Sequence, residues 1–390
     1  MSKTWKWTLR GLLVLAVVLL ALAVWQREAL IRLQAVNTLF AEDRIVSNFS
    51  HMDRLFEHRP VPRGDGPVTP LPQGAPLALP DDFDAWLQRR AVTSLVMLKD
   101  GTVVHESYHL GTGPVDLRIS WSVAKSYLSA LFGVILAEGA IDSLDDPITK
   151  YAPSLTGGAY DGATIRNVLN MASGVTFDED YLDFWSDINK MGRVLALGGS
   201  MDGFAADLSE TFTTPGKQYK YVSIDTHVLS MVLRGATGRD IPELLSEKII
   251  GPMGLEAEPY YVTDGYGVAF VLGGLNLTTR DYARMGQMFL QRGRYNSRQI
   301  VPADWVADST APTAPTAPGK IQYGYQWWIP ADATPGEFLA RGVYGQYVYI
   351  NRPSGVVIAT TGADKQFRAD GAFDDSLSMF RTLTAIAQEE

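Results

Sequence analysis

Ser122-Val-Ala-Lys125 stands where an apolar lead-in gives way to an apolar helical pattern that runs from Tyr127 to Ile135. A serine and a lysine three positions apart at the start of a helix lie on one face, one turn apart. The lysine can then act as the base that a serine nucleophile needs, because a free hydroxyl is a poor nucleophile at neutral pH. The alternative is a plain helix start, with Ser122 as the N-cap and Lys125 in solvent. A lysine in the first turn opposes the helix dipole, which counts for the catalytic interpretation.

The composition narrows the class of protein. The chain has 390 residues, of which 46% are hydrophobic and 20% charged, and its net charge is −9. These values are typical of a globular protein with one large domain or two closely packed ones. Because the charge balance is acidic and no long basic run occurs, we do not expect nucleic acid as a partner. The chain has no cysteine and its five histidines are scattered, so we expect no disulfide, no metal and no cofactor.

The N-terminus carries a targeting signal. Basic residues precede Gly11–Trp25, an uncharged apolar run of 15 residues. A signal anchor would keep this helix in the membrane, whereas a cleavable signal peptide would end near Ala21-Leu22-Ala23. We favour the anchor, and both interpretations place the main domain outside the cytoplasm. The sequence thus predicts an anchor or signal segment over residues 1–30, a linker or extended arm over 31–80, and a globular domain over 81–390.

The pattern of elements predicts an α+β fold. Residues 59–80 are rich in proline and glycine and are not expected to form a regular element. Two short β runs flank the turn at Asp100-Gly101, residues 266–272 have β character, and two further β runs follow at 347–351 and 355–361. The segment from about 145 to 260 is mostly helical. We therefore expect one antiparallel sheet built from both ends of the domain, flanked by helices, with a mostly helical insertion.

A serine hydrolase also needs a proton route to its leaving group and two donors for the oxyanion. The pKa of Lys125 must fall for it to act as a base, and a nearby tyrosine would help by sharing its proton. Tyr221 is the candidate, because it follows a Pro-Gly turn and precedes Ser223 at the start of a helix. A structural tyrosine ahead of a capped helix is the alternative.

These motifs, in this order, resemble the serine β-lactamase and penicillin-binding-protein superfamily. The likeness extends to Leu144-Asp-Asp-Pro-Ile148, to residues 164–174 and 274–286, and to Tyr323-Gly-Tyr-Gln-Trp-Trp328, which are similar to the class C-like branch. The resemblance covers about residues 85–385. It implies a β-lactamase/transpeptidase-like fold, with Ser122 as nucleophile and Lys125 and Tyr221 as base and proton relay.

Within that branch, two stretches look most like the 6-aminohexanoate-dimer hydrolase and esterase group. The first holds Tyr181, which matches a tyrosine that reaches into the site of that group. The second is Gly342-Val-Tyr-Gly-Gln346. The resemblance implies that a residue within 343–346 donates one backbone N–H to the oxyanion, the other coming from Ser122. The substrate-binding residues that we predict are Tyr181, Ser223, Tyr344, Gly345 and Gln346.

Two departures from the superfamily pattern bear on the substrate. Ser223 stands where the tyrosine triplet usually ends in asparagine, and the stretch Val343-Tyr344-Gly345 lacks the lysine of the β-lactamase strand motif. That lysine helps to bind the carboxylate of a β-lactam, so its absence favours a small ester or short linear amide. The alternatives are a D,D-peptidase or β-lactamase acting on cell-wall-like substrates, and a non-catalytic penicillin-recognising sensor.

The resemblance and the N-terminus together predict a location. We expect a single-pass protein of a bacterial inner membrane with its catalytic domain in the periplasm, or a periplasmic protein released by signal cleavage. The natural substrate and the oligomeric state are not indicated by the sequence.

Overall fold

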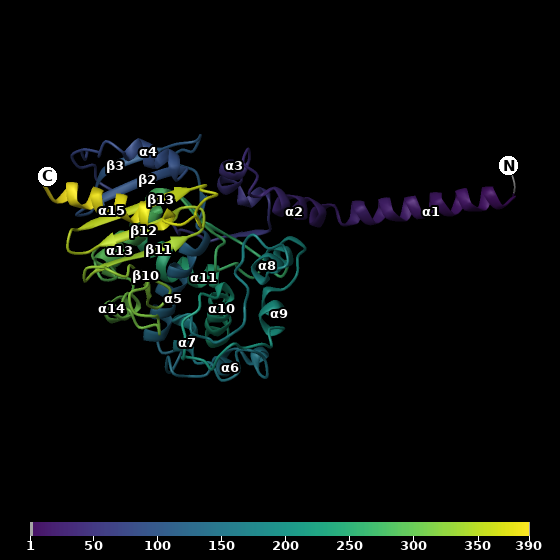
Figure 1. Ribbon diagram of the computed structural model, residues 1–390. Coiled ribbons are helices and arrows are strands. Elements are labelled where there is room, and N and C mark those ends of the chain that lie inside the picture. The colour runs from purple at the N-terminus through teal and green to yellow at the C-terminus, as the bar shows by residue number, and fades with distance from the viewer. Residues whose placement is uncertain (1–2, 390) are drawn as a thin grey trace.

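The computed structural model describes residues 3–389, and the two ends of the domain contribute the strands of one seven-stranded sheet (Figure 1). The strand order is β3-β2-β13-β12-β11-β10-β9, and all neighbours are antiparallel. The strands span Val92–Lys99 (β2), Thr102–Tyr108 (β3), Gln322–Tyr323 (β9), Trp328–Ile329 (β10), Glu337–Gly342 (β11), Gln346–Asn351 (β12) and Val356–Gly362 (β13). Leu98 of β2 lies opposite Val357 of β13, which confirms the predicted sheet built from both ends.

Helices cover both faces of this sheet. The helices α4 (Phe83–Arg89) and α15 (Ala372–Glu389) pack on one face, and α13 (Thr279–Leu290) packs on the other. Successive strand residues point to opposite faces, so Met97 of β2 joins the α4–α15 cluster while its neighbour Leu98 joins the main core. Because both faces are covered, every residue of this strand except Lys99 is buried.

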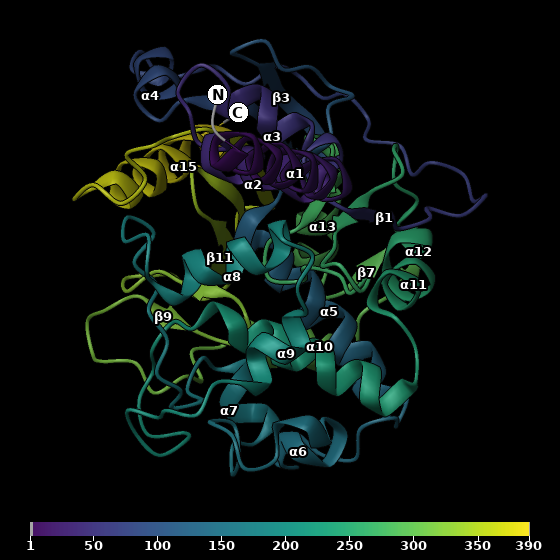
Figure 2. The ribbon, with the colours of Figure 1, turned by 90° about the vertical axis from the view of Figure 1, so that its right-hand side faces the viewer.

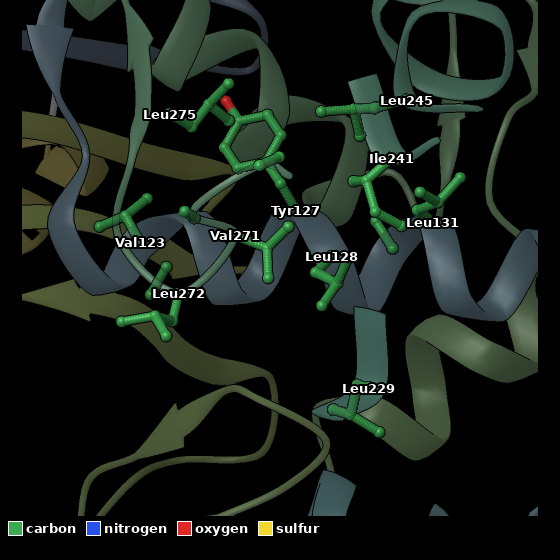
Figure 3. Close-up of a cluster of buried hydrophobic side chains, with 14 of the residues drawn as sticks. Val123, Tyr127, Leu128, Leu131, Leu229, Ile241, Leu245, Val271, Leu272 and Leu275 are labelled. Atoms are coloured by element: carbon green, nitrogen blue, oxygen red, sulfur yellow. The ribbon is translucent and has the colours of Figure 1, made fainter. Parts of the chain in front are cut away.

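Helix α5 (Ala124–Ala137) runs through the centre of the main core. Its side chains are buried on nearly every side, and Figure 3 shows Tyr127, Leu128 and Leu131 surrounded by apolar residues of other segments. Gly133 lies against Trp305, where a Cβ atom would come within 2.2 Å of the indole ring. Such enclosure fixes the start of α5, and therefore Ser122, within the body of the protein.

The inserted region between α5 and the C-terminal strands is mostly helical, as predicted. Its helices are α6 (Ile148–Tyr151), α7 (Ile165–Leu169), α8 (Asp187–Ala196), α9 (Met201–Ala206), α10 (Ser223–Thr237), α11 (Ile241–Leu245) and α12 (Gly251–Met253). Helix α10 is buried along most of its length and contacts α5. This contact brings the predicted Tyr221 segment up to the Ser122 end of α5.

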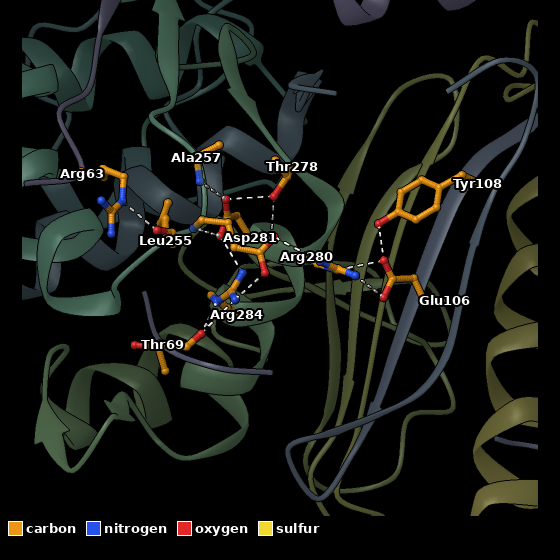
Figure 4. A network of polar contacts seen from close by, with 11 residues as sticks. Arg63, Thr69, Glu106, Tyr108, Leu255, Ala257, Thr278, Arg280, Asp281 and Arg284 are labelled. Atoms are coloured by element: carbon orange, nitrogen blue, oxygen red, sulfur yellow. Dashed lines mark hydrogen bonds and ion pairs between the residues drawn. The ribbon is translucent and has the colours of Figure 1, made fainter. Parts of the chain in front are cut away.

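A polar network ties α13 to the sheet and to the extended arm (Figure 4). Asp281 and Arg284 are both buried and form an ion pair of 2.8 Å. Arg284 also donates to the backbone oxygen of Thr69 in the arm, while Arg280 pairs with Glu106 of β3 at 2.8 Å. A buried charge is costly unless it is paired and hydrogen-bonded, and each of these groups is.

One part of the N-terminal segment packs on the body of the protein, and the part that precedes it in the chain extends away from the body. Helix α2 (Arg27–Thr38) contacts α8, and Arg32 donates to the backbone oxygen of Ala196 at 3.1 Å. Figure 2, which looks along α1 toward the body, shows α2 and α8 on the same side of the molecule. Helix α1 (Lys3–Trp25), which precedes α2 in the chain, projects from the body. Its span Thr4–Trp25 has no buried residue and a mean hydropathy of 2.3. By length and composition α1 can cross a membrane, and a signal sequence would look the same.

Two local predictions were wrong. Part of the proline-rich stretch forms strand β1 (His58–Pro60), which pairs with β5 (Tyr260–Val262) in a sheet of order β1-β5-β6-β4. Proline is tolerated there because β1 is an edge strand. Residues 266–272 form turns rather than a strand, and β6 (Leu275–Leu277) follows them.

A glycine within residues 266–272 and the side chain of Asp264 explain why no strand forms there. Gly267 has a φ of +77°, a conformation that breaks a strand. The side-chain oxygen Oδ1 of Asp264 accepts hydrogen bonds from the backbone N–H groups of Tyr266 and Val268, and these bonds form a tight turn.

Candidate active site

Ser122 lies in a short 3₁₀ turn, Trp121–Val123, immediately before α5. Its side chain makes no helix-capping hydrogen bond, so the plain helix start is not what the structure contains. Trp121 has a φ of +42°, which residues other than glycine rarely adopt. Strain of this kind persists only where the surroundings hold it, and here it points the backbone of Ser122 toward a cavity.

Lys125 is almost completely buried and lies beside the serine. Its Nζ donates to Ser122 Oγ at 2.9 Å and to the backbone oxygen of Leu272 at 2.7 Å. Burial lowers the pKa of Lys125 to about 7, against a weaker opposing effect of Glu179 and Asp225. A large fraction of Lys125 is therefore neutral at physiological pH and can accept a proton.

Tyr221 completes the predicted trio. Lys125 Nζ lies 5.4 Å from the centre of its ring, which stacks on Trp328 at 5.2 Å. Burial and the charge of Glu179 raise the pKa of Tyr221, while the hydroxyls of Ser122 and Ser223 act in the other direction. The phenol is thus protonated at neutral pH and lies close to the serine hydroxyl.

Glu179 organises the predicted substrate-binding residues Tyr181 and Ser223. Its carboxylate accepts from the Tyr181 hydroxyl at 3.1 Å and from the backbone N–H of Ser223. The Ser223 hydroxyl is buried close to Tyr221, Tyr181 and Glu179, and Ser223 lines a cavity next to Ser122. Ser223 therefore lies where a substrate at Ser122 would meet it.

Strand β11 passes directly beside the serine. A Cβ atom on Gly342 would lie 2.7 Å from the oxygen of Ser120 and 3.1 Å from the nitrogen of Ser122, so only glycine permits this approach. The N–H groups of Ser122 and Val343 donate to no other group within residues 3–389. Two backbone N–H groups without another acceptor, next to a serine hydroxyl, are the kind of donors that an oxyanion requires.

The remaining predicted residues, Tyr344, Gly345 and Gln346, follow β11 in the chain, and only Tyr344 lines a space that reaches Ser122. Tyr344 stacks on Phe40 at 4.9 Å and lines a cavity next to Ser122. The side chain of Gln346 bonds instead to the backbone of Val343 and Gly362, and Gly345 lies against Gly362. Gly345 and Gln346 thus shape the turn from behind, and they line neither of the spaces that reach the serine.

Two spaces meet at Ser122 and Tyr181. One is an apolar cavity of about 130 Å³, and the other is a polar cleft of about 470 Å³ that also contains Tyr221. Arg341 lines the cleft, with its guanidinium over the rings of Phe373 at 4.2 Å and Trp328 at 5.6 Å. No carboxylate among the described residues pairs with Arg341, so the cleft offers a cation near the serine.

Sequence reasoning missed Arg341 because it searched for a cation at 343–345. The signal available was the pair Arg341-Gly342, since the glycine that touches Ser122 marks the strand register. Among the tryptophans of this part of the chain, Trp328 lines the polar cleft, Trp327 is buried in the core and Trp185 is exposed. Within residues 3–389, no group of three or more histidine or acidic side chains could hold a metal ion.

The fold and the Ser122–Lys125 pair define the class as serine hydrolases of α+β architecture. The sequence profile of the Beta-lactamase family matches residues 83–377, and the chain belongs to this family. A 6-aminohexanoate-dimer hydrolase of Paenarthrobacter ureafaciens is 29% identical over 323 residues, which cover 79% of this chain and 80% of that protein.

Two solved structures share the fold. One, from Bacillus anthracis, is provisionally named a 6-aminohexanoate-dimer hydrolase. It has a TM-score of 0.76 at 23% identity and covers 90% of this chain and 96% of its own. The other, a provisionally named β-lactamase of Bacteroides dorei, has a TM-score of 0.63 at 23% identity and covers 78% of this chain and 96% of its own.

Proposed function

We propose that this serine hydrolase cleaves a small ester or a short linear amide through an acyl-enzyme on Ser122. The observation that carries the proposal is the distance of 2.9 Å from Lys125 Nζ to Ser122 Oγ, combined with a pKa of Lys125 near 7. A neutral amine in hydrogen-bond contact with a hydroxyl is the arrangement that activates a serine.

Each group has a role in the proposed reaction. Lys125 accepts the proton of Ser122 as Oγ bonds to the substrate carbonyl carbon, and the N–H groups of Ser122 and Val343 hold the resulting oxyanion. Tyr221 gives its proton to the leaving alcohol or amine as that bond breaks, and it recovers a proton from Lys125. Water then attacks the acyl carbon and loses a proton to the Lys125–Tyr221 pair. That proton passes to Ser122 Oγ as its bond to the acyl carbon breaks, which releases the acid and restores the serine. Tyr181 and Ser223 position the substrate.

We expect Tyr221→Phe to slow the hydrolysis of poor leaving groups most. An alkyl ester or amide needs a proton on its leaving group, so kcat should fall by about 10²–10⁴-fold. A p-nitrophenyl ester should lose far less, because nitrophenolate leaves without a proton. The measurement compares kcat for the two substrates. The matched control is Tyr219→Phe, because Tyr219 is a half-buried tyrosine of the same segment whose hydroxyl is also buried. Equal losses for both leaving groups would remove Tyr221 from the proton route.

A covalent label tests the nucleophile. A fluorophosphonate forms a P–O bond with an activated serine and releases fluoride, and we expect the label on the peptide that contains Ser122. Labelling should require an unprotonated Lys125 and should decline as the pH falls below about 7. A label on another serine, or none, would contradict the proposal.

Arg341 favours a second candidate function. A cation in the cleft beside Ser122 could bind the carboxylate of a β-lactam or of a cell-wall peptide, as a D,D-peptidase, a β-lactamase or a penicillin-recognising sensor would. Incubation with a labelled penicillin distinguishes these functions. Rapid turnover would support a β-lactamase, a stable adduct on Ser122 would support a peptidase or sensor, and no reaction would leave the ester or amide function.

We further propose that α1 anchors the enzyme in a bacterial inner membrane with the catalytic domain in the periplasm. The apolar span without buried residues and the basic residues before it support this orientation. Extraction of membranes at high pH should leave the full-length protein in the pellet. A soluble periplasmic form whose N-terminus lies just after residue 23 would instead support signal cleavage.

A further inference from the structure

The apolar cavity beside Ser122 has walls from segments far apart in the sequence. Helix α2 and the residues after it contribute Val36, Leu39 and Phe40, and α8 contributes Gly192 and Leu195. The remaining walls include Leu272 and Tyr344, and no charged side chain lines the cavity within the described residues. The lining residues with polar side-chain groups are Ser122, Tyr181, Asn189, Ser223, Tyr344 and Trp121.

The position of Tyr221 decides which part of a substrate enters this cavity. Tyr221 lines the polar cleft and not the apolar cavity, whereas Ser122 borders both. A proton donor must lie within hydrogen-bond reach of the group that it protonates. The leaving group therefore occupies the polar cleft, which leaves the apolar cavity for the acyl group.

We infer that the substrate is an ester or amide of an uncharged, apolar acyl chain, which is bound in this cavity against the N-terminal helices. The inference rests on the proposed function and adds to it the chemical class of the acyl group. The volume of about 130 Å³ is similar to that of an apolar protein cavity of about 150 Å³ that holds benzene, so it suits a chain of about six carbon atoms. A chain ending in an ammonium group would bury an unpaired charge, which is strongly unfavourable.

Under this inference the N-terminal segment contributes residues to the active site, in addition to carrying the apolar helix α1. Phe40 stacks on Tyr344 at 4.9 Å, and Phe49 packs edge-on against the same ring at 5.4 Å. Helix α2 is held on α8 through Arg32, whose guanidinium also pairs with Glu57 at 2.6 Å. The wall of the proposed acyl cavity therefore depends on residues of α2 and the residues after it, which closely follow α1 in the chain.

Gly192 allows a direct test of the cavity. Gly192 lines the cavity, and a Cβ atom at this position would meet no heavy atom within 4 Å, so the backbone there has room for a larger side chain. The full-length enzyme is assayed with p-nitrophenyl acetate, butyrate and hexanoate. For the native enzyme we expect kcat/KM to rise by about fourfold per methylene as each becomes buried. Gly192→Phe should lower kcat/KM for hexanoate at least about tenfold and leave that for acetate within about twofold, while Gly192→Ala retains both.

A second pair of variants tests the contribution of α2. Val36→Trp should reproduce the selective loss on hexanoate, whereas Asn37→Trp, at the exposed neighbouring position, should not. The acetate rate reports folding in each variant, because it needs the catalytic residues but not the cavity. p-Nitrophenyl 6-aminohexanoate, which adds a terminal ammonium, should be hydrolysed at least about tenfold more slowly than hexanoate.

The outcomes separate this inference from the proposed function. Hydrolysis of acetate with no chain-length preference, equal losses on acetate and hexanoate in Gly192→Phe, or full activity on the 6-aminohexanoate ester would each overturn the acyl-cavity assignment alone. If the native enzyme hydrolyses none of the esters and no fluorophosphonate label reaches Ser122, the proposed function itself fails.

Discussion

Ser122→Ala is expected to lower kcat for ester hydrolysis by at least about 10⁴-fold, because removal of a serine nucleophile removes the acyl-enzyme route as a whole. The side chain that Lys125 contacts at 2.9 Å would be missing, while the cavity, the cleft and the two backbone N–H groups would remain. Substrate binding should therefore change little. The measurement is kcat and KM with p-nitrophenyl butyrate, together with loss of the fluorophosphonate label.

Ser126→Ala is the matched control for this variant. Ser126 lies four residues further along, in α5, is buried like its surroundings, and donates to the backbone oxygen of Gln326 at 2.8 Å. Its loss should cost about 1 kcal/mol of stability and leave kcat intact. Similar rates for native enzyme and Ser122→Ala would show that another group is the nucleophile.

Lys125→Met is expected to lower kcat/KM by about 10²–10⁴-fold, the usual contribution of a general base. In the native enzyme kcat/KM should rise with pH through an apparent pKa near 7, because only the neutral amine accepts a proton. The rise should disappear in Lys125→Met, and Lys248→Met, which removes an ion pair with Glu138 remote from the site, should retain it. A pH profile without this rise in the native enzyme would contradict Lys125 as the base.

The same variant should be more stable than the native protein. The pKa of Lys125 falls from 10.5 to about 7 on folding, so between these values the unfolded chain binds a proton that the folded protein does not. The free energy of unfolding therefore rises with pH from about 7 to 10.5, and the burial penalty is fully present below pH 7.

At neutral pH, removal of this penalty in Lys125→Met should stabilise the folded protein by about 4 kcal/mol. Loss of the hydrogen bond to the oxygen of Leu272 should destabilise it by about 1–3 kcal/mol. We expect a net gain of about 1–3 kcal/mol, measured by urea denaturation at pH 7 and again at pH 10, where the gain should shrink. A variant that is less stable at both pH values would contradict the low pKa.

Several parts of the fold could be predicted because the information was local. The Asp100-Gly101 turn and α13 follow from turn chemistry and hydrophobic periodicity, and the structure has both. The β character expected over 266–272 failed because Gly267, within the segment, adopts a positive φ and forms a turn that a short apolar run does not reveal. The strand in the proline-rich stretch was missed because its pairing partner, Tyr260–Val262, lies far away in the sequence.

The residues of the candidate site can also be divided into those that local sequence patterns predicted and those that depend on the tertiary structure. The spacing of Ser122 and Lys125 is a property of one helix start, and the order of motifs pointed to Tyr221 and Tyr181. The cation of Arg341 was missed because only the approach of β11 to Ser122 identifies the strand register. Gly345 and Gln346 were predicted to contact substrate, but the turn directs the side chain of Gln346 to backbone atoms behind it.

The sequence by itself determined that a serine and a lysine share one face at a helix start, and that the chain resembles serine hydrolases. Only the tertiary structure decided that Lys125 is buried, and burial is what lowers its pKa toward neutrality, as its proposed role as a base requires. Likewise, only the packing of α2 and α8 around Ser122 created an apolar space opposite Tyr221. Burial and the side of approach depend on residues far apart in the chain, and no local pattern encodes them.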